Sequence, residues 1–330
     1  MLMSDVNGGH DGRSGGPLAP RAPTDWGALT PYTSTGAAPR FSVVVPTYDR
    51  RESLERCLAA LAAQELGREG FEVVVVDDGG ARSPREVVER FRESLDVRLV
   101  EQANAGPAAA RNAGAAASRG EYLVFTDDDC LPEPQWLIGL AESVTSFPGR
   151  AVGGRVDNAL SDGIYSTASQ LLIEFLYEYY NAAGDEGRFF ITSNLAVPAA
   201  RFRALGGFDV TFPLAAAEDR DLCDRWLEQG NAMVYADGAV VQHAHALGFR
   251  SFCRQHLNYG RGAYHLHRAR ARRGVTALRI EPMRFYSRLV AYPLKREHGA
   301  RSVALSALLL VSQVVYATGY VLERVAGRNG

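Results

Sequence analysis

The feature that most constrains this chain is an alternation of short apolar runs with helix-like segments, which begins at Phe41. The strand-like runs, rich in valine and phenylalanine, lie at 41–45, 71–76, 97–100 and 121–125, and the helix-like segments at 53–64, 84–92 and 107–118. Continuous apolar strands separated by helices are typical of a mostly parallel sheet that helices cover on both faces. This part of the chain is therefore predicted to have an α/β fold.

The rest of the chain is less regular, and we find no internal repeat in it. We predict strands at 190–197 and 232–235 and helices at 169–180 and 218–229. In Ser169–Tyr180 the apolar residues recur at helical spacing, which favours packing against the core over a substrate-binding surface. With 330 residues, 46% of them hydrophobic, the chain can bury a substantial core.

Residues 1–40 have a different composition. They contain seven Gly and five Pro with few large apolar residues, so we predict a disordered segment. We expect no secretion signal here, because the basic start and apolar core of such a signal are missing. The four cysteines are far apart and form no C-x-x-C pair, which argues against a zinc cluster or disulfide framework and favours the reducing cytoplasm.

The C-terminal part carries an excess of positive charge. Residues 250–301 contain 13 Arg and Lys against two acids, Glu281 and Glu297, and we predict a basic helical region at 246–302. Such a basic segment can bind anionic lipid, a phosphorylated ligand or nucleic acid, or it can be a helix face exposed to water. The charge alone does not distinguish these alternatives.

The last segment, 303–330, is predicted to be an apolar helix, because 303–322 contains no charge across 20 positions. That length can cross a bilayer, although the polar residues Ser306, Ser312 and Gln313 weaken the case. Because it is apolar all round, the helix must be buried in protein, in an oligomer or in lipid. The preceding basic stretch suits a cytosolic flank, so a membrane-inserted helix would place the chain at the cytoplasmic face of the plasma membrane.

Three consecutive acids, Asp127, Asp128 and Asp129, follow the apolar run at 121–125. Like charges this close repel, so a cation or a network of donors must neutralise them. On an extended chain Asp127 and Asp129 point to one face and Asp128 to the other. The pair forms half of a magnesium or manganese site that a diphosphate would complete. The alternatives are a surface calcium site, or capping and turn residues before Leu131-Pro132.

Two further motifs precede these acids. Asp77 and Asp78 end the strand-like run at 71–76, where an Asp can accept the imide proton of a uracil-like base, although Asp-Gly after a strand is usually only a turn. Arg111 and Asn112 lie in an alanine-rich helix whose N-terminal region can face an anion. An exposed helix residue is the alternative for Arg111.

Acids and histidines follow in the second half. Glu218, Asp219 and Asp221 lie near a helix start, where they serve either as dipole-favoured caps or as a general base for an attacking hydroxyl. His243 and His245 come just after a strand, where they can bind a metal or phosphate-facing groups, or form an exposed pair.

Together, in the order PTYDR, VVDDGG, NAGPAAARNAG, FTDDDC, GGFD and AEDRDL, these motifs resemble the catalytic domains of glycosyltransferase family 2, which have the Rossmann-like GT-A fold. The resemblance covers about 41–245. It implies an inverting enzyme that uses a divalent metal, Mn or Mg, and moves a sugar from a nucleotide-diphosphate sugar, with UDP favoured. The implied acceptor is a hydroxyl on a glycan, a lipid-linked molecule or a small molecule, in polysaccharide, glycolipid or natural-product glycosylation, and no nucleic-acid partner is implied.

The resemblance also implies roles for individual residues. Donor-binding positions, from the first loop to the acidic motif, are Pro46, Thr47, Tyr48, Asp77, Asp78, Arg111, Asp127 and Asp128. Asp127 and Asp129 match the acids of the family's D-x-D element and are both implied at the metal, with Asp129 favoured over Asp127 as the direct ligand. Asp219, paired with Glu218, takes the place of the general base. His243 matches a histidine that completes the metal or diphosphate shell, and nearby His245 leaves the register open. The sugar and acceptor region is matched by Ser193, Asn194, Gly206 and Gly207.

One departure from the family concerns processivity. Polymer-forming members carry a Q-x-x-R-W element after the base, whereas this chain has only Cys253-Arg-Gln-His256, so a single addition is favoured. Two rivals are considered: a sugar-phosphate nucleotidyltransferase, which would open with a Gly-rich loop where this chain has PTYDRRESL, and a non-catalytic nucleotide-sugar-binding membrane scaffold. A Walker loop and a dinucleotide fingerprint are missing from the sequence, which disfavours an ATPase or dehydrogenase.

Overall fold

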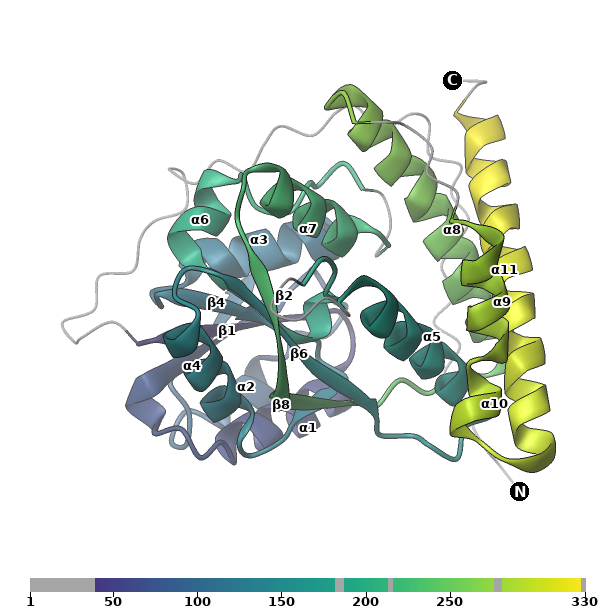
Figure 1. Cartoon of the computed structure of the whole chain (residues 1–330). Helices are drawn as coiled ribbons and strands as arrows, with labels where there is room; N and C mark the ends of the chain where they lie inside the picture. The colour runs from purple at the N-terminus through teal and green to yellow at the C-terminus, as the bar shows by residue number, and fades with distance from the viewer. Residues whose placement is uncertain (1–38, 182–186, 213–215, 276–280, 328–330) are drawn as a thin grey trace.

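An eight-stranded sheet with the strand order β3-β2-β1-β4-β7-β6-β8-β5 forms the centre of the structure (Figure 1). The computed structural model describes residues 39–181, 187–212, 216–275 and 281–327. The strands are β1 (Phe41–Thr47), β2 (Phe71–Asp77), β3 (Val97–Glu101), β4 (Tyr122–Phe125), β5 (Cys130–Pro132), β6 (Ala151–Asn158), β7 (Leu195–Pro198) and β8 (Met233–His243). The helices are α1 (Arg51–Ala62), α2 (Arg85–Glu89), α3 (Pro107–Ala117), α4 (Trp136–Ser146), α5 (Ile164–Tyr180), α6 (Ala199–Ala204), α7 (Glu218–Glu228), α8 (Phe249–Arg272), α9 (Met283–Ala291), α10 (Pro293–Arg296) and α11 (Gly299–Ala326).

The sheet is parallel where the alternation of strands and helices predicts it. β3, β2, β1 and β4 run parallel to one another. β7 is antiparallel to both β4 and β6, and β5 is antiparallel to β8, so the complete sheet is mixed. The predicted α/β class with a helical C-terminal extension is confirmed. The strand predicted at 190–197 is shorter, because the helical turn Thr192–Asn194 comes before β7.

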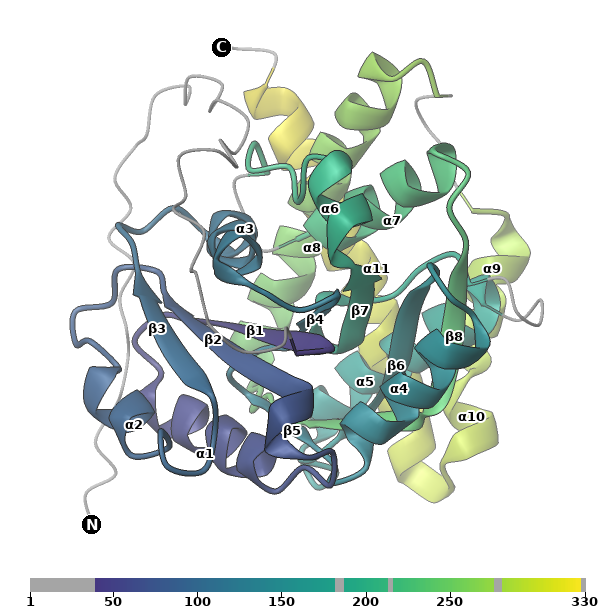
Figure 2. The same cartoon turned by 90° about the vertical axis from the view of Figure 1, so that its left-hand side faces the viewer.

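Helices cover both faces of the sheet, with α1 and α2 on one side and α3, α6 and α7 on the other (Figure 2). Alternating side chains of the central strands build a core on each face. Val43 and Val45 of β1 pack with residues of α1, α2 and α4, whereas Val44 packs with residues of α3, α6 and α7. α3 comes especially close to the sheet at Gly114, where a Cβ atom would lie 2.4 Å from Cγ1 of Val44. The alanine and glycine content of α3 therefore places Arg111, on the same helix, close to the carboxyl ends of the strands.

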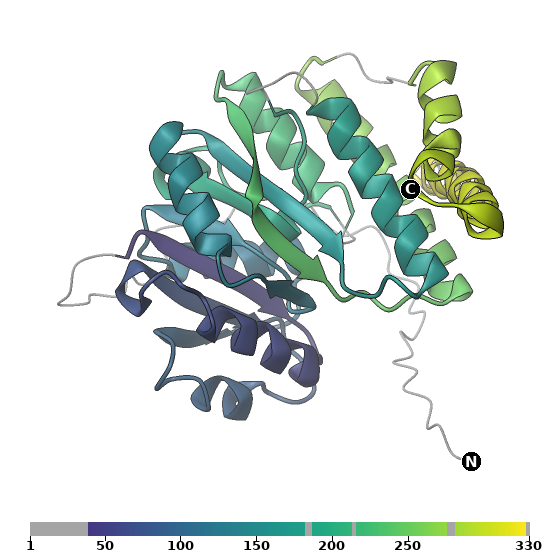
Figure 3. The same ribbon diagram turned by 60° about the horizontal axis from the view of Figure 1, so that its bottom comes forward.

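A layer of helices on one side of the sheet carries the C-terminal part of the chain (Figures 1 and 3). Residues of α5, α8, α9 and α11 form a third apolar cluster. α8 and α11 lie side by side in the same direction, with Leu257 close to Gly319 and Tyr264 close to Gly327. A Cβ atom on Gly319 would lie 2.1 Å from the Leu257 carbonyl oxygen, so the two backbones touch.

The apolar C-terminal helix is observed as α11, and within the described ranges it is the one helix long and apolar enough to cross a membrane. Its most apolar window has a mean hydropathy of 1.7 and is only 22% buried. Packing against the rest of the protein therefore covers only part of the apolar surface of this helix. The predicted boundary at 302 falls inside α11, and residues 1–38 lie outside the described part of the chain.

Candidate active site

A cavity of about 1880 Å³ lies where the carboxyl ends of β1, β2 and β4 meet helices α5, α7, α8 and α11. The sequence-predicted residues that line it are Pro46, Thr47, Tyr48, Asp78, Arg111, Asp127, Asp128, Asp129, Ser193, Glu218, Asp219, His243 and His245. Motifs that are far apart in the sequence therefore share one concave site. Such convergence is expected at the carboxyl edge of parallel strands.

The three consecutive acids do not alternate as an extended chain would require. The chain turns at Asp128 and Asp129, before β5 begins. Asp127 accepts a hydrogen bond from Arg111 (2.8 Å), whereas Asp128 and Asp129 both contact Arg50, at 3.0 and 2.8 Å. The expectation that Asp127 and Asp129 share a face while Asp128 points away is wrong, because it assumed a strand where the backbone forms a turn.

Asp128 is held by Thr47 as well as by Arg50. The Thr47 hydroxyl donates a hydrogen bond of 2.7 Å to Oδ2 of Asp128, which joins the end of β1 to the acidic turn. Burial raises the pKa of Asp128 to about 6, although Arg50 and Thr47 act in the opposite direction. Asp128 is therefore part of the support for the turn and has little free capacity to bind a ligand.

Asp129 lies between Arg50 and two histidines. Its Oδ1 atom is 3.2 Å from Nε2 of His243, and its Oδ2 atom is 3.2 Å from Nδ1 of His245. Burial raises the pKa of Asp129, but the hydrogen bonds from both histidines and the charge of Arg50 hold it well below the usual range. The resemblance leaves the register between His243 and His245 open, and in the structure both imidazoles contact this carboxylate.

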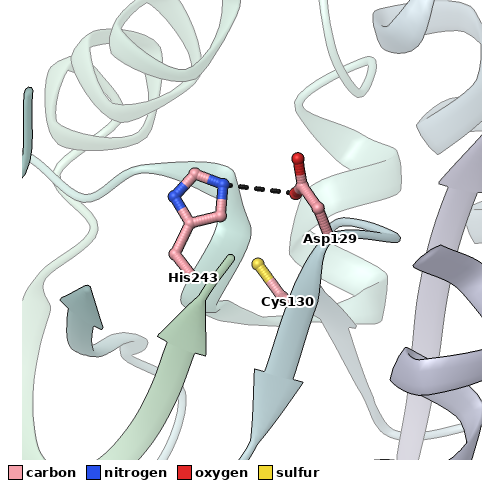
Figure 4. A group of neighbouring side chains, drawn as sticks. All are labelled: Asp129, Cys130 and His243. Atoms are coloured by element: carbon pink, nitrogen blue, oxygen red, sulfur yellow. Dashed lines mark hydrogen bonds and ion pairs between the residues drawn. The ribbon is translucent and has the colours of Figure 1, made fainter. Parts of the chain in front are cut away.

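The donor set around Asp129 fits a divalent cation. Asp129, Cys130 and His243 have potential ligand atoms within 4.8 Å of one another (Figure 4). The Cys130 thiol is fully buried, which raises its pKa well above the usual value and keeps it protonated. A carboxylate and an imidazole are left, and both are groups that ligate divalent metal ions. Pairing of β5 with β8 brings Cys130 opposite His243 and so sets this geometry.

Asp78 organises the loop that follows β2. It accepts hydrogen bonds from the Gln102 side chain (2.7 Å) and from the amides of Ala105 (2.9 Å) and Gly106 (2.8 Å). Asp77 does not line the cavity and instead accepts a hydrogen bond from the Gly80 amide (3.0 Å). Asp78, not Asp77, is therefore the acid of this pair that lies at the cavity.

Arg111 connects the acidic turn to the start of α7. It is buried and donates to Glu218 at 3.0 Å as well as to Asp127. The alternative that Arg111 is an exposed helix residue is therefore wrong. Without Arg111, Asp127 and Glu218 would bring uncompensated negative charge together, which would be costly.

Asp219 differs from Glu218 in its contacts. The Asp219 carboxylate accepts a hydrogen bond from the Arg220 amide (2.7 Å) and has no side-chain hydrogen-bond partner within the described ranges. Burial, followed by the charge of Glu218, raises the pKa of Asp219 to about 7. Ala217, which comes directly before Glu218 at the start of α7, has a φ of 72°, an uncommon conformation for a non-glycine residue. Asp219 is thus a half-buried carboxylate whose pKa suits proton transfer near neutral pH.

Asn194 does not lie at the cavity. It is fully buried and accepts from the Trp136 indole (2.8 Å) while donating to the carbonyls of Arg155 (2.8 Å) and Ala239 (2.9 Å). Its amide therefore joins β6, β8 and α4 and is not available to a ligand. Asn112 is likewise structural, since it exchanges hydrogen bonds with the Phe208 backbone.

The structure adds residues that sequence reasoning missed. Arg50 lies within the PTYDR motif, so its closeness to Thr47 could have drawn attention to it. On α8, Arg254, Gln255 and Tyr259 also line the cavity. Nothing in the local sequence marks those three, because packing of α8 against distant elements brings them to the site.

Comparisons with known proteins give a consistent result. Residues 42–204 match the family model described as "Glycosyl transferase family 2". Validoxylamine A glucosyltransferase of Streptomyces hygroscopicus subsp. jinggangensis is 32% identical over 217 residues, which are 57% of this chain and 51% of that protein. Glycosyltransferase AglE of Haloferax volcanii is 33% identical over 132 residues, 39% of this chain and 43% of its own length. The chain thus spans about half the length of these relatives.

Solved structures show the same fold at low identity. The mannosyltransferase PcManGT from Pyrobaculum calidifontis, in complex with GDP-Man and Mn²⁺, matches with a TM-score of 0.56 and 21% identity over 90% of this chain and 84% of that one. TarS 1–349 of Staphylococcus aureus in complex with UDP-GlcNAc matches with a TM-score of 0.55 and 18% identity over 88% and 92%.

Proposed function

Because the chain belongs to glycosyltransferase family 2 and has the GT-A fold, we propose that it transfers a sugar from a nucleotide-diphosphate sugar to an acceptor hydroxyl. The observation that carries this proposal is the position of Asp219. Its carboxylate has a raised pKa and shares one cavity with the acidic turn, Arg111 and His243. A base and a diphosphate-binding region that face the same space are what a direct displacement requires.

In the proposed reaction Asp219 accepts the proton of the acceptor hydroxyl as that oxygen attacks the anomeric carbon. The bond from the anomeric carbon to the diphosphate breaks on the opposite face, so the configuration inverts. Glu218 has a different role, because its hydrogen bond to Arg111 commits it to holding the acidic turn against α7.

The donor is proposed to be a UDP-sugar. The loop held by Asp78 and the segment Pro46–Tyr48 line the end of the cavity where β1 and β2 end, and we place the nucleotide there. Support for a nucleotide sugar comes from the similar folds solved with UDP-GlcNAc and GDP-Man. Arg50 and Arg111 supply fixed positive charge near the diphosphate.

Asp129 and His243 are the residues proposed to hold a divalent cation, Mn or Mg. When bound, such a cation would neutralise negative charge on the diphosphate. This chain's own contribution is to keep Asp129 ionised, through His243, His245 and Arg50. We further propose a single addition in each cycle, because this chain has only Cys253-Arg-Gln-His256 where polymer-forming members carry Q-x-x-R-W. We also propose action in the cytoplasm, at the inner face of the membrane, because α11 is apolar and largely exposed.

The test compares two neighbouring acids. Asp219→Asn should abolish transfer while the chain still binds nucleotide, because the base is lost and the donor end of the cavity is unchanged. Asp224→Asn is the matched control on α7, since Asp224 also lines the cavity but is paired with Arg270. Sugar transfer is measured as nucleoside diphosphate release, and nucleotide binding by thermal shift. Near-normal turnover in Asp219→Asn, or release of pyrophosphate from a nucleoside triphosphate, would refute the proposal.

A further inference from the structure

We propose that the acceptor is an amphiphile taken from a lipid surface on which the exposed side of α11 docks. The apolar part of the amphiphile then lies in the part of the cavity that residues of α5, α8, α9 and α11 line, here called its arm. This inference rests on the proposed function, because it names the acceptor class of the same site.

One side of α11 is apolar and exposed over most of its length. It is formed by Val303, Ala307, Leu310, Val314, Ala317, Val321 and Val325, here called the α11 stripe. Leu310 and Val314 keep 54% and 61% of their surface exposed. Monomeric soluble proteins rarely leave such a long apolar patch uncovered, so the α11 stripe is an interaction surface.

The helices that pack against α11 carry basic residues that suit anionic lipid headgroups. α9 and α10 both pack against α11. Arg284 and Arg288 on α9 and Lys295 on α10 are exposed, and none of the three has an acidic partner within the described ranges. An exposed apolar helix flanked by free cations is the combination with which peripheral proteins bind the membrane interface.

The cavity opens beside the stripe. Ala317 and Val321 belong to the α11 stripe and also line the cavity, where Tyr316 and Tyr320 continue the wall. A molecule anchored in the lipid under α11 can therefore extend into the cavity without crossing bulk water. A second copy of the chain seated on the stripe would instead cover this opening, and for this reason lipid is favoured over a dimer.

The arm of the cavity carries apolar and aromatic side chains against which an apolar chain or ring can pack, beside polar residues such as Gln313 and His267. Its walls include Leu176 of α5, Leu266 of α8, Phe285 of α9 and Tyr320 of α11. The same continuous cavity reaches Asp219. Its volume of about 1880 Å³ exceeds the roughly 300–1,000 Å³ of a typical small-ligand site, so a donor leaves the arm free for a second molecule.

Vesicle flotation tests the docking surface. The full chain is floated with vesicles of phosphatidylcholine and phosphatidylglycerol, and the bound fraction should fall about ten-fold in the double variant Leu310→Gln, Val314→Gln. The matched control is Ala59→Gln, Ala62→Gln, which places the same two amides on the exposed side of α1 and should float like the wild type. Wild-type chain that stays unbound, or a stripe variant that floats unchanged, overturns the proposal.

Detergent monomers test the arm of the cavity. Dodecyl maltoside below its critical micelle concentration should bind at least about ten-fold more tightly than octyl maltoside by calorimetry, because more methylenes are buried. Ala317→Trp should remove this difference by narrowing the opening. Ala307→Trp places the same indole on the α11 stripe away from the cavity and should keep it. Equal binding of the two detergents, or equal effects of the two tryptophans, contradicts the assignment of the arm.

Two further measurements separate the explanations. Light scattering that shows a dimer of the wild type and a monomer of the stripe variant would assign the α11 stripe to a second copy of the chain and overturn the lipid proposal. Donor binding is followed in the same samples by thermal shift with Mn²⁺. A chain that binds no nucleotide sugar refutes the proposed function, whereas donor binding without flotation refutes only this inference.

Discussion

Nη1 of Arg50 lies 2.8 Å from Oδ2 of Asp129, so a fixed protein cation contacts the carboxylate that we assign to the metal. The same guanidinium nitrogen also contacts Asp128 at 3.0 Å. The acids after β4 are therefore neutralised by the chain itself, and a divalent ion would share Asp129 with Arg50.

This competition predicts that Arg50→Met makes the protein more dependent on Mn²⁺. Without the guanidinium, Asp128 and Asp129 repel each other, so the metal-free variant should be less stable and should gain more from added metal. The rise in melting temperature on addition of Mn²⁺ should exceed that of the wild type. Arg51→Met is the control, because Arg51 pairs with the distant Glu86. Equal Mn²⁺ responses in the two variants would argue against competition at Asp129.

Removal of the metal should affect turnover more than nucleotide binding. If Asp129 and His243 hold a cation at the diphosphate, treatment with EDTA should stop sugar transfer, and Mn²⁺ or Mg²⁺ should restore it. His243→Ala should raise the Mn²⁺ concentration needed for half-maximal rate about ten-fold or more. Full activity of the wild type in EDTA would refute the assignment of Asp129 and His243 to a metal.

The pH dependence of the reaction should report on Asp219. Its pKa is raised to about 7, and a general base acts only when deprotonated. The value of kcat/KM should therefore fall about ten-fold for each unit below pH 7 and level off above it. The check is a pH–rate profile with saturating metal. A profile whose acid limb lies near pH 4, the usual range of a carboxylate, would show that another group takes the proton.

Glu72 should make stability depend on pH at the other end of the sheet. It is fully buried and accepts hydrogen bonds from Ser42 (2.6 Å), from the Arg119 amide (2.6 Å) and from the Arg119 side chain (2.8 Å). Burial alone would raise the pKa of Glu72. The hydrogen bonds and the charge of Arg98 lower it by more than burial raises it, so the pKa in the folded protein is below the usual value. The stabilisation is fully present above the unfolded pKa of about 4.3 and is lost as the pH falls towards the lower folded value.

Glu72→Gln should therefore lower the free energy of unfolding by about 3 kcal/mol at neutral pH, because two arginines lose a buried partner. Urea unfolding at pH 7 and at lower pH measures the difference between variant and wild type, which should shrink in acid. Glu86→Gln is the control, since Glu86 is an exposed partner of Arg51 and should change stability very little.

The contact between α8 and α11 should not tolerate a methyl group. In Gly319→Ala the new Cβ would meet the Leu257 carbonyl oxygen at 2.1 Å, so the helices must separate. We expect a loss of about 1–3 kcal/mol and faster amide exchange in α11. Gly238→Ala is the control, because a Cβ there meets nothing within 4 Å. Unchanged exchange in Gly319→Ala would mean that the helix pair adapts without cost.

The sequence was sufficient to predict the strands and helices of the parallel part, because buried strands such as β1 and β2 carry a strong local signal. It did not predict the direction of β7 or the short β5, since pairing partners are chosen by contacts far apart along the chain. The same limit applies to the site. The resemblance pointed to Asp129 and His243, which the structure places side by side, whereas nothing local showed that Asn194 would face α4 and β6.

The turn at Asp128 and Asp129 could not be foreseen either, because it depends on Thr47 and Arg50, which come from the end of β1 and the start of α1. Arg254, Gln255 and Tyr259 reach the cavity only through the packing of α8. Residues in motifs at strand ends and helix starts, such as Asp78, Arg111 and Asp219, were accessible from the sequence, and residues brought to the cavity only by the packing of α8 were not.

The end of β8 connects the C-terminal helices to the residues of the candidate active site. β8 ends at His243, the chain continues through His245, and α8 begins directly after Gly248. α8 is in turn fixed to α11 where Gly260 and Gly319 let the backbones touch. A tilt of this helix pair would therefore act on the backbone that carries both imidazoles, and through them on the carboxylate of Asp129.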